Sequence, residues 1–393
     1  MTEKAEEEFI KLSLQLFQRR RSGEDPSDFV ERINEIFKTI ENTPLGKMLT
    51  PDDIRDFFNW VVTKIDKWIE HISDEEFITQ LKSDLLTTKT FDFYVPIYCL
   101  YGFPEGVKLG YSTVVDFQNL PTEISKYFIM FWEHCFTTDT QYHRTKEEYV
   151  NLKKRSTFIH FVIETNGSYK ANEKAINLAE EALHIIRFLY RINFNIVDMR
   201  YKIREVRQEG GMEGMAGLPF IGGANYGKFV EKEIPILTDI FVKSNPNEIE
   251  RKIRNAVRIF GIQTSVKNQQ VRFVLLVTCL ESLLMTESDR DYILWKLAEK
   301  VAFILDGNKR ELNDYIKKAY DKRLAFIHGS KSEDSLVTEN DIFSIEGVVS
   351  NLVWKMIDFV KNGYTHVQKQ NNVKSINEYI EETKFGKTSS SPE

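Results

Sequence analysis

The chain has 393 residues, 42% of them hydrophobic and 28% charged, with a formal net charge of −6 and a pI of about 5.8. This composition, rich in Phe and Tyr, excludes a largely disordered chain and indicates two or three globular domains. The acidic balance argues against a broad, non-specific binder of polyanions, although it is compatible with a local basic cleft.

The cysteines and the N-terminus indicate a cytoplasmic protein. Cys99, Cys135 and Cys279 are odd in number, widely spaced and set among apolar neighbours, which favours buried thiols in a reducing compartment over disulfides. The first residues, MTEKAEEEFIKL, are acidic and amphipathic and lack the basic start and apolar core of a signal peptide. No apolar run approaches the length of a membrane span, so we expect no membrane contact.

Residues 1–88 have the pattern of an N-terminal helical region. Apolar positions within residues 9–17 form a helical stripe that stops before a run of three arginines, and a second stripe covers residues 29–40. Thr50 followed by Pro51 has the form of a helix start, because threonine caps the first turn and proline fits it. We therefore expect this region to consist of helices.

The pattern changes to that of an α+β region over residues 89–205. Residues 91–98 are aromatic and β-branched, and residues 108–117 and 156–164 have the pattern of two further strands. A long helix is predicted over residues 169–193, because apolar residues recur there on one helical face. Strands and a helix in this proportion indicate a small α+β domain.

Seven glycines between residues 210 and 227 mark residues 206–245 as a glycine-rich linker. A phosphate-binding loop of the Walker type would end in Gly-Lys-Ser or Gly-Lys-Thr, but here Gly227 and Lys228 precede Phe229. We therefore prefer the interpretation as a flexible linker.

Residues 246–365 return to a helical pattern. Pro246 and Asn247 open a first helix, and the nearly uninterrupted apolar run of residues 271–285 predicts a central buried helix. Three more helices are predicted at residues 292–305, 312–327 and 342–360. Residues 366–393 are assigned to a C-terminal extension whose polar end has the composition of a disordered tail.

The stretch from Tyr320 to Ser330 carries the residues best suited to chemistry. Its apolar positions continue a helical stripe, and Gly329 stands where a glycine ends a helix, which places His328 in the last turn. A histidine there can donate or accept a proton near neutral pH. Arg323 precedes it by five positions, about 140° around an ideal helix, so the two side chains diverge. Either the helix ends or distorts before His328, or the site combines residues from two copies of the helix in a dimer.

This stretch resembles the Arg-x4-His signature of the HEPN family (higher eukaryotes and prokaryotes nucleotide-binding). Two upstream segments are similar to helices of the Apea-like branch of that family. Residues 279–284 (CLESLL) resemble its "aLEsLl" helix, and residues 297–305 (LAEKVAFIL) resemble its "lseRvAflL" helix, with Lys300 in place of the usual arginine. The three segments have the expected order and spacing, and the resemblance covers roughly residues 245–362.

The resemblance implies a bundle of about four or five helices that dimerises and cleaves RNA without a metal ion or another cofactor. The implied reaction is attack of an RNA 2′-oxygen on the adjacent phosphate, which leaves a 2′,3′-cyclic phosphate and a 5′-hydroxyl. In that reaction His328 would handle a proton at the 2′-oxygen or the leaving oxygen, and Arg323 would bind the phosphate oxygens. Such enzymes commonly serve bacterial or archaeal defence and toxin systems, with the upstream region, here residues 89–205, as a sensor.

Two acidic residues are predicted to support this site. Glu281 lies in an apolar helix and needs a partner, and an ion pair with Arg323 would serve both stability and function. Asp321 precedes His328 by seven positions and lies on the same helical face, where it can either orient the ring or remain solvated. The family often has a polar residue directly after the motif arginine, whereas this chain has Leu324.

The sequence therefore predicts a mainly α protein with a C-terminal HEPN-type helical bundle, preceded by a helical and small α+β N-terminal region. The favoured function is an endoribonuclease that acts on RNA as a homodimer. Two alternatives remain open. One is a non-catalytic HEPN module that binds RNA or a nucleotide and signals through its partner. The other is a scaffold whose helices simply dimerise.

Overall fold

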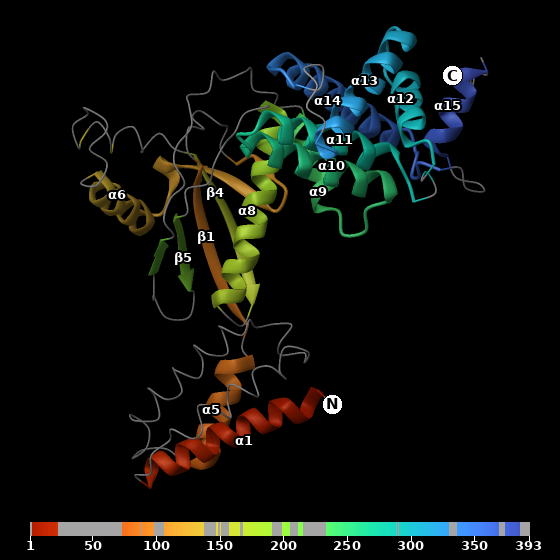
Figure 1. Cartoon of the computed structure of the whole chain (residues 1–393). Coiled ribbons are helices and arrows are strands. Elements are labelled where there is room, and N and C mark those ends of the chain that lie inside the picture. The colour runs from red at the N-terminus through yellow and green to blue at the C-terminus, as the bar shows by residue number, and fades with distance from the viewer. Residues whose placement is uncertain are drawn as a thin grey trace. The chain divides into compact units, whose positions relative to one another are not determined.

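The computed structural model is mainly α-helical (Figure 1). It describes residues 2–22, 73–86, 88–97, 106–136, 147, 150, 157–165, 168–190, 199–204, 211–214, 233–287, 289, 291–329, 336–368 and 374–385. Helices make up 71% of the described residues, and a small antiparallel sheet of four strands accompanies them. The predicted combination of a mainly α protein with a small α+β region is therefore confirmed. No helix in the described ranges is long and apolar enough to cross a membrane.

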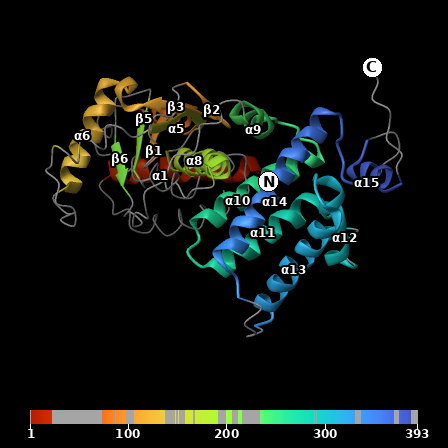
Figure 2. The same ribbon diagram turned by 90° about the horizontal axis from the view of Figure 1, so that it is seen from above.

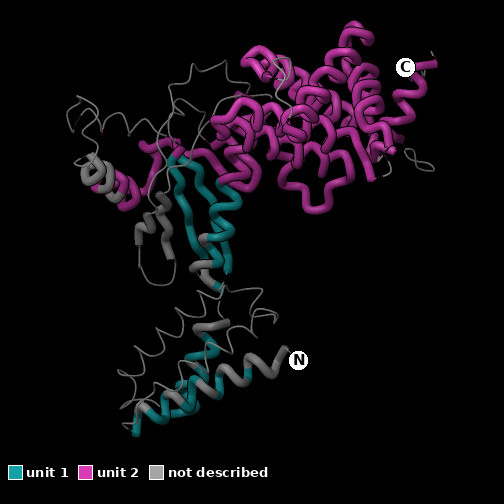
Figure 3. Tube along the Cα trace, viewed as in Figure 1, with its two compact units in different colours: residues 1–96, 158–179, 198–217 teal, residues 97–157, 180–197, 218–393 magenta. Residues whose placement is uncertain are grey.

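The chain forms two compact units, which Figure 3 shows in different colours. Unit 1 comprises residues 1–96, 158–179 and 198–217, and unit 2 comprises residues 97–157, 180–197 and 218–393. Helix α8 (Ser168–Tyr190) contributes its first half to unit 1 and its second half to unit 2. The helices predicted for residues 246–365 all belong to unit 2, which therefore carries the candidate site.

In unit 1, helices α1 (Thr2–Arg21) and α5 (Asp74–Leu86) pack against each other. Phe17 and Phe77 are fully buried between them and stack with ring centroids 4.4 Å apart. The first predicted helix is confirmed, since α1 ends within the arginine run. The helices predicted between residues 29 and 68 lie outside the described residues.

A sheet forms the second part of unit 1, with its strands in the order β4-β1-β5-β6. The strands are β1 (Lys89–Ile97), β4 (Thr157–Thr165), β5 (Met199–Arg204) and β6 (Gly211–Gly214). β5 pairs antiparallel with both β1 and β6, so that Tyr201 lies opposite Tyr94 on one side and Met212 on the other. β1 and β4 confirm two predicted strands. The sequence pattern does not predict β5, and β6 lies within the range predicted as a linker.

The first half of helix α8 lies along this sheet (Figures 1 and 2). Phe93 of β1 and Phe161 of β4 are buried and stack with ring centroids 5.6 Å apart. The first half of α8 buries small residues at four-residue spacing, namely Ala171, Ala175 and Ala179. Such a stripe of small side chains lets a helix approach its neighbours closely. The long helix predicted over residues 169–193 is confirmed as far as Tyr190, and residues 191–193 lie outside the described residues.

Unit 2 begins with a hairpin and two helical segments, η1 (Phe117–Asn119) and α6 (Thr122–Phe136). The hairpin strands, β2 (Lys108–Leu109) and β3 (Ser112–Asp116), pair antiparallel around Gly110, whose φ of +62° favours glycine. The prediction of a single strand over residues 108–117 is wrong, because the chain reverses at this glycine. Thr238 of α9 (Glu233–Val242) donates a hydrogen bond of 2.8 Å to the backbone carbonyl of Lys108. Like β6, α9 lies within the range predicted as a linker.

The rest of unit 2 is a helical bundle with α11 at its centre (Figure 2). Its helices are α10 (Glu248–Ser265), α11 (Gln269–Leu284), α12 (Ile293–Ile304), α13 (Lys309–Ile327), α14 (Glu339–Lys361) and α15 (Ile376–Lys384). α11 contacts α10, α12, α13 and α14, and this position explains the almost continuous hydrophobic run in its sequence. The five predicted helices are confirmed, whereas α15 falls in the range predicted as an extension.

A buried polar cluster determines how three of these helices meet. Glu346 of α14 accepts hydrogen bonds from Gln263 of α10 at 2.9 Å and from Arg272 of α11 at 3.1 Å. Arg272 also donates to the side-chain oxygen of Gln263 at 3.1 Å. Gln263 and Glu346 are buried, and buried polar groups need partners. The cluster therefore favours one register of α10, α11 and α14 over registers that leave these groups unpaired.

The second half of α8 packs against α10 at a glycine. A Cβ atom added to Gly261 would collide with Nδ1 of His184 and lie 2.8 Å from its Cα atom. Beside this contact, Phe188 and Phe260 meet edge to face with ring centroids 5.2 Å apart. Burial, helped by two nearby arginines, lowers the pKa of His184 to about 4. The imidazole is therefore neutral where the helices touch.

Replacing Gly261 with alanine is expected to destabilise unit 2, because the added methyl group collides with His184 and forces the helices apart. The cost should be about 1–3 kcal/mol, the usual range for overpacking. Gly347 of α14 provides the control, since a Cβ atom there meets nothing within 4 Å. Gly347→Ala should leave stability unchanged or raise it by up to about 1 kcal/mol through helix propensity. Urea denaturation measures both variants, and an equal effect of the two would contradict the close contact.

Candidate functional site

Helix α13 positions the two residues predicted to act in catalysis. Asn308 caps its first turn by accepting hydrogen bonds from the backbone N–H groups that follow. At the other end, the N–H of His328 still bonds to the carbonyl of Leu324 at 2.9 Å, and Gly329 follows with φ of +70°. The predicted helix end at this glycine is confirmed, because this backbone conformation strains every residue with a Cβ atom.

Arg323 is held in unit 2 by an acidic partner from α11. Its Nη2 atom lies 3.2 Å from Oε2 of Glu281, and 18% and 20% of the two side chains are exposed. The predicted ion pair between Glu281 and Arg323 is therefore present. The pair gives the carboxylate a cation in an otherwise apolar helix and directs the guanidinium toward α11.

Tyr320 forms a group of three with Arg323 and Glu281. Its ring centroid lies 5.2 Å from the guanidinium carbon of Arg323. Burial raises the pKa of Tyr320, the neighbouring carboxylate of Glu281 raises it further through charge and a hydrogen bond, and Arg323 acts in the opposite direction. The phenol therefore stays protonated and donates to Glu281. The Nε atom of Arg323 is buried and has no acceptor among the described residues.

Sequence reasoning treated Tyr320 only as an apolar position of its helix. The available signal was its spacing from Arg323, because residues three positions apart on a helix are neighbours on its surface. A tyrosine beside an arginine on one face can place its ring against the guanidinium. The contact with Glu281 has no such local signal, since it depends on how α11 and α13 pack.

His328 is exposed at the end of α13. The helix is regular up to Ile327 and the His328 N–H continues its hydrogen-bond pattern, so His328 points about 140° away from Arg323 around the axis. No distortion of α13 brings the two side chains together within one chain. A site in which both residues meet one phosphate then needs a second copy of this helix.

Asp321 is exposed and lies two helical turns, roughly 10 Å, before His328. A direct hydrogen bond between the two side chains is out of reach at that separation. Its carboxylate makes no hydrogen bond or ion pair with a described residue. Nor do acidic side chains gather into a metal site, because no three His, Cys, Asp or Glu residues of the described part lie close enough to hold an ion.

Lys322, next to Arg323, ties the end of α13 to the start of α14. It donates to Asp341 at 2.8 Å, and Asp341 forms a capping box with Thr338 at the N-terminus of α14. Burial alone would raise the pKa of Asp341, but the hydrogen bonds from Lys322 and Thr338 outweigh burial and lower it. The charged carboxylate therefore links the two helices close to the candidate site.

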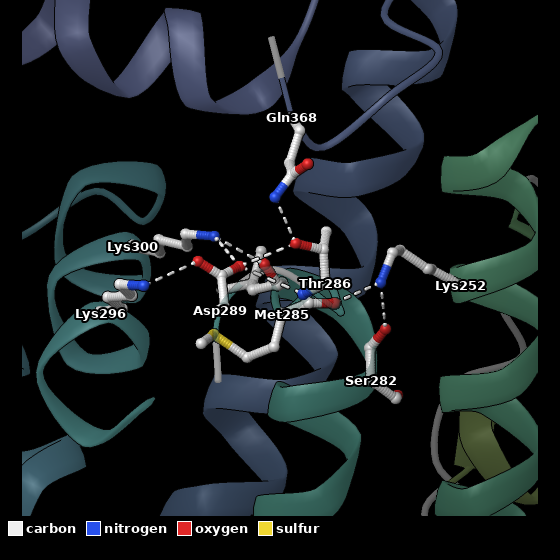
Figure 4. A network of polar contacts seen from close by, with 9 residues as sticks. Lys252, Ser282, Met285, Thr286, Asp289, Lys296, Lys300 and Gln368 are labelled. Atoms are coloured by element: carbon white, nitrogen blue, oxygen red, sulfur yellow. Dashed lines mark hydrogen bonds and ion pairs between the residues drawn. The ribbon is translucent and has the colours of Figure 1, made fainter. Parts of the chain in front are cut away.

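A network of lysines holds the C-terminal end of α11, the helix that supplies the acidic partner of Arg323 (Figure 4). Lys252 of α10 donates to the carbonyls of Ser282 at 3.1 Å and Met285 at 2.6 Å, and Lys300 of α12 donates to the carbonyl of Leu284 at 3.0 Å. The last carbonyls of a helix lack partners within it and form the negative end of its dipole. The two lysines satisfy these carbonyls and tie α10 and α12 to α11.

Asp289, in the turn after α11, belongs to the same network (Figure 4). It accepts hydrogen bonds from Lys300 at 3.0 Å and from the backbone and hydroxyl of Thr286 at 3.1 Å, and Lys296 lies 3.4 Å away. Gln368 donates to the Thr286 hydroxyl at 2.6 Å. Burial alone would raise the pKa of Asp289, but the hydrogen bonds outweigh burial and lower it. The carboxylate is therefore charged and fixes the turn between α11 and α12.

No protein-family model matches the chain, and comparison with curated proteins and with solved structures also finds no match. The site offers a tethered arginine, a buried tyrosine, a carboxylate and an exposed histidine on a rigid frame. These groups suit the binding of an anion and the transfer of a proton.

Replacing Lys300 with methionine is expected to destabilise the protein by about 3–5 kcal/mol, because Asp289 is left as a buried charge without its closest cation. The control is Lys296→Met, which removes a lysine from the same carboxylate at a more exposed position. The Lys296 side chain is 37% exposed, so its loss should cost less than about 1 kcal/mol. Urea denaturation at neutral pH measures both variants. Equal losses would show that the buried pair does not hold the end of α11.

Proposed function

We propose that the chain is a metal-independent endoribonuclease of the HEPN type that acts on RNA as a homodimer. The observation that carries the proposal is the arrangement on α13, where a tethered cation, Arg323, and an exposed imidazole, His328, stand five residues apart at the helix end. The resemblance of residues 245–362 to Apea-like HEPN domains supports the same reading. We place the protein in the cytoplasm, in a defence or toxin system, with residues 89–205 as the sensor.

Arg323 suits a phosphate that gains negative charge during the reaction. Its guanidinium is permanently charged and presents a planar fork of donors. Glu281 engages the Nη2 atom and Nε is buried, so a phosphate would meet the guanidinium at the 18% of the side chain that remains exposed. An arginine that is already oriented loses less conformational entropy when the substrate binds.

His328 suits the proton transfers of RNA cleavage. As the 2′-oxygen bonds to phosphorus, its proton passes to an imidazole, and as the bond from phosphorus to the 5′-oxygen breaks, that oxygen takes up a proton. A neutral imidazole can accept the first proton and a protonated one can supply the second. At each shared site the one imidazole can serve one of these transfers, while water takes or supplies the other proton. The products are a 2′,3′-cyclic phosphate and a 5′-hydroxyl.

The surface between the two motif residues favours contact with a second copy of α13. On an ideal helix, Leu324 and Ile327 occupy the arc between the arginine and the histidine, and Ile327 is 52% exposed. Two more exposed apolar residues are Leu336, three residues before α14, and Phe343, within its second turn. An ion pair joins α14 to α13. A twofold interface over this strip would remove apolar surface from water and bring the arginine of one copy to the histidine of the other.

A non-catalytic module is the second candidate, and the ion pair with Glu281 is the observation that favours it. An arginine beside a carboxylate at 3.2 Å attracts a phosphate less strongly than a free one. Leu324 stands where HEPN domains often have a polar residue. In this case the bundle binds RNA or a nucleotide, or only dimerises, and does not cut.

Arg323→Ala and His328→Ala are each expected to lower RNA cleavage by at least about a hundredfold, since they remove the phosphate-binding cation and the proton-transfer group. Incubation of a long single-stranded RNA with EDTA present, followed by analysis of the product ends for cyclic phosphate, measures the effect. Arg310→Ala is the matched control, because it removes an exposed arginine from the first turn of the same helix. It should retain full activity.

Arg323→Lys separates catalysis from the structural ion pair. Lysine keeps a charge for Glu281 but lacks the planar fork, so the variant should fold with a melting temperature near that of the wild type while cleavage falls. Wild-type protein that binds RNA without ever cutting it would contradict the nuclease and favour the non-catalytic module. Protein that dimerises and ignores RNA would favour the scaffold.

A further inference from the structure

Two large aromatic residues are exposed at the start of α12. Tyr292 and Trp295 have 77% and 57% of their surfaces accessible to water. Burial of aromatic side chains contributes much of the stability of a folded chain. Two aromatic residues that stay exposed within one helical turn do not make this contribution. This placement indicates a role in contacts with another molecule.

The backbone at Tyr292 is held in a strained conformation. Its φ of 58° and ψ of 36° lie in the left-handed region, and it is the one non-glycine residue with positive φ among those described. Tyr292 follows Asp289 by three residues, and the hydrogen bonds of Asp289 with Lys300 and Thr286 hold this turn (Figure 4). The hydrogen bonds around Asp289 therefore hold Tyr292 in this left-handed conformation, with its side chain exposed to solvent.

A lysine from the neighbouring helix lies over Trp295. Helices α12 and α13 run side by side (Figure 2), and Nζ of Lys317 lies 3.8 Å from the centroid of the Trp295 ring. Lys318 follows it and is exposed. We call Tyr292, Trp295 and Lys317 the aromatic platform, because they combine two accessible π faces with positive charge.

We propose that the aromatic platform binds a base of single-stranded RNA, an inference that rests on the proposed nuclease function and names part of its substrate contact. A base can stack on Trp295 or Tyr292, since every nucleobase has a π face. Lys317 then moves from the ring to a backbone phosphate, which carries a full opposite charge. Stacking of this kind holds a strand without reading its sequence.

The aromatic platform stands in line with His328 on α13. Lys317 precedes His328 by eleven residues, which separates them by about 20° around the helix axis and about 16 Å along it. A strand stacked on the platform can therefore reach His328 within a few nucleotides, so the platform would position RNA for cleavage at the shared site.

The lysine over the Trp295 ring favours RNA over a protein partner. Exposed tryptophans also anchor protein interfaces, but lysine is depleted at the centres of such interfaces. Here one lysine lies on the tryptophan ring itself. Positive charge next to an aromatic face is the combination that single-strand binding proteins use.

Binding of a 5′-fluorescein oligoadenylate with 2′-O-methyl groups tests the platform, because this probe cannot undergo attack by its 2′-oxygens. By fluorescence anisotropy with the full chain at low salt, Trp295→Ala should raise Kd about tenfold, the usual loss of one stacked base. Tyr292→Ala should also raise Kd, and Trp295→Phe should keep most of the affinity. Phe385→Ala is the matched control, since Phe385 is likewise 77% exposed but ends α15, and it should bind like the wild type.

The outcomes separate the platform from the nuclease. Platform variants that lose affinity for the probe, in a protein that never cuts natural RNA, would support the platform and end the nuclease proposal. Unchanged affinity in Trp295→Ala, or no binding of the probe by the wild type, would overturn the platform even where cleavage is observed. Loss of a protein partner by Trp295→Ala with unchanged RNA binding would assign the surface to protein recognition and likewise overturn the proposal.

Discussion

The ion pair between Glu281 and Arg323 is the constraint from which the rest of the site follows. It joins α11, at the centre of the bundle, to α13, whose end carries His328. A carboxylate in an apolar helix is costly without a partner, so Glu281 needs a cation, and Arg323 supplies it. The same contact that stabilises the bundle therefore orients the guanidinium that the proposed reaction requires.

Helix geometry then limits what this arginine can do. Because α13 stays regular to its end, Arg323 and His328 leave it in different directions, and one chain does not bring them to one phosphate. Two copies related by a twofold axis remove this conflict. The lysine network behind α11 and the link from Lys322 to Asp341 hold the surrounding helices, so two copies can meet with defined geometry.

The sequence predicted the bundle helices because their signals are local: apolar periodicity, the Asn247 cap and the glycine that ends α13. The ion pair of Glu281 followed from the need of a charge in an apolar helix for a partner. What the sequence could not predict depends on residues far apart. β6 has two glycines in four residues and is a strand only through its pairing with β5. The contacts of Lys252 and Lys300 with the end of α11 join residues 16 to 33 positions apart in the sequence, and no local sequence pattern predicts them.

The most direct test of the central claim, that the arginine of one protomer acts with the histidine of its partner, combines two inactive variants in one dimer. Arg323→Ala and His328→Ala chains carrying different tags are co-expressed, and the mixed dimer is purified through both tags. One of its two shared sites is complete, so RNA cleavage should return to about half of the wild-type rate. A mixed dimer that remains as inactive as either parent variant would contradict a site shared between two copies.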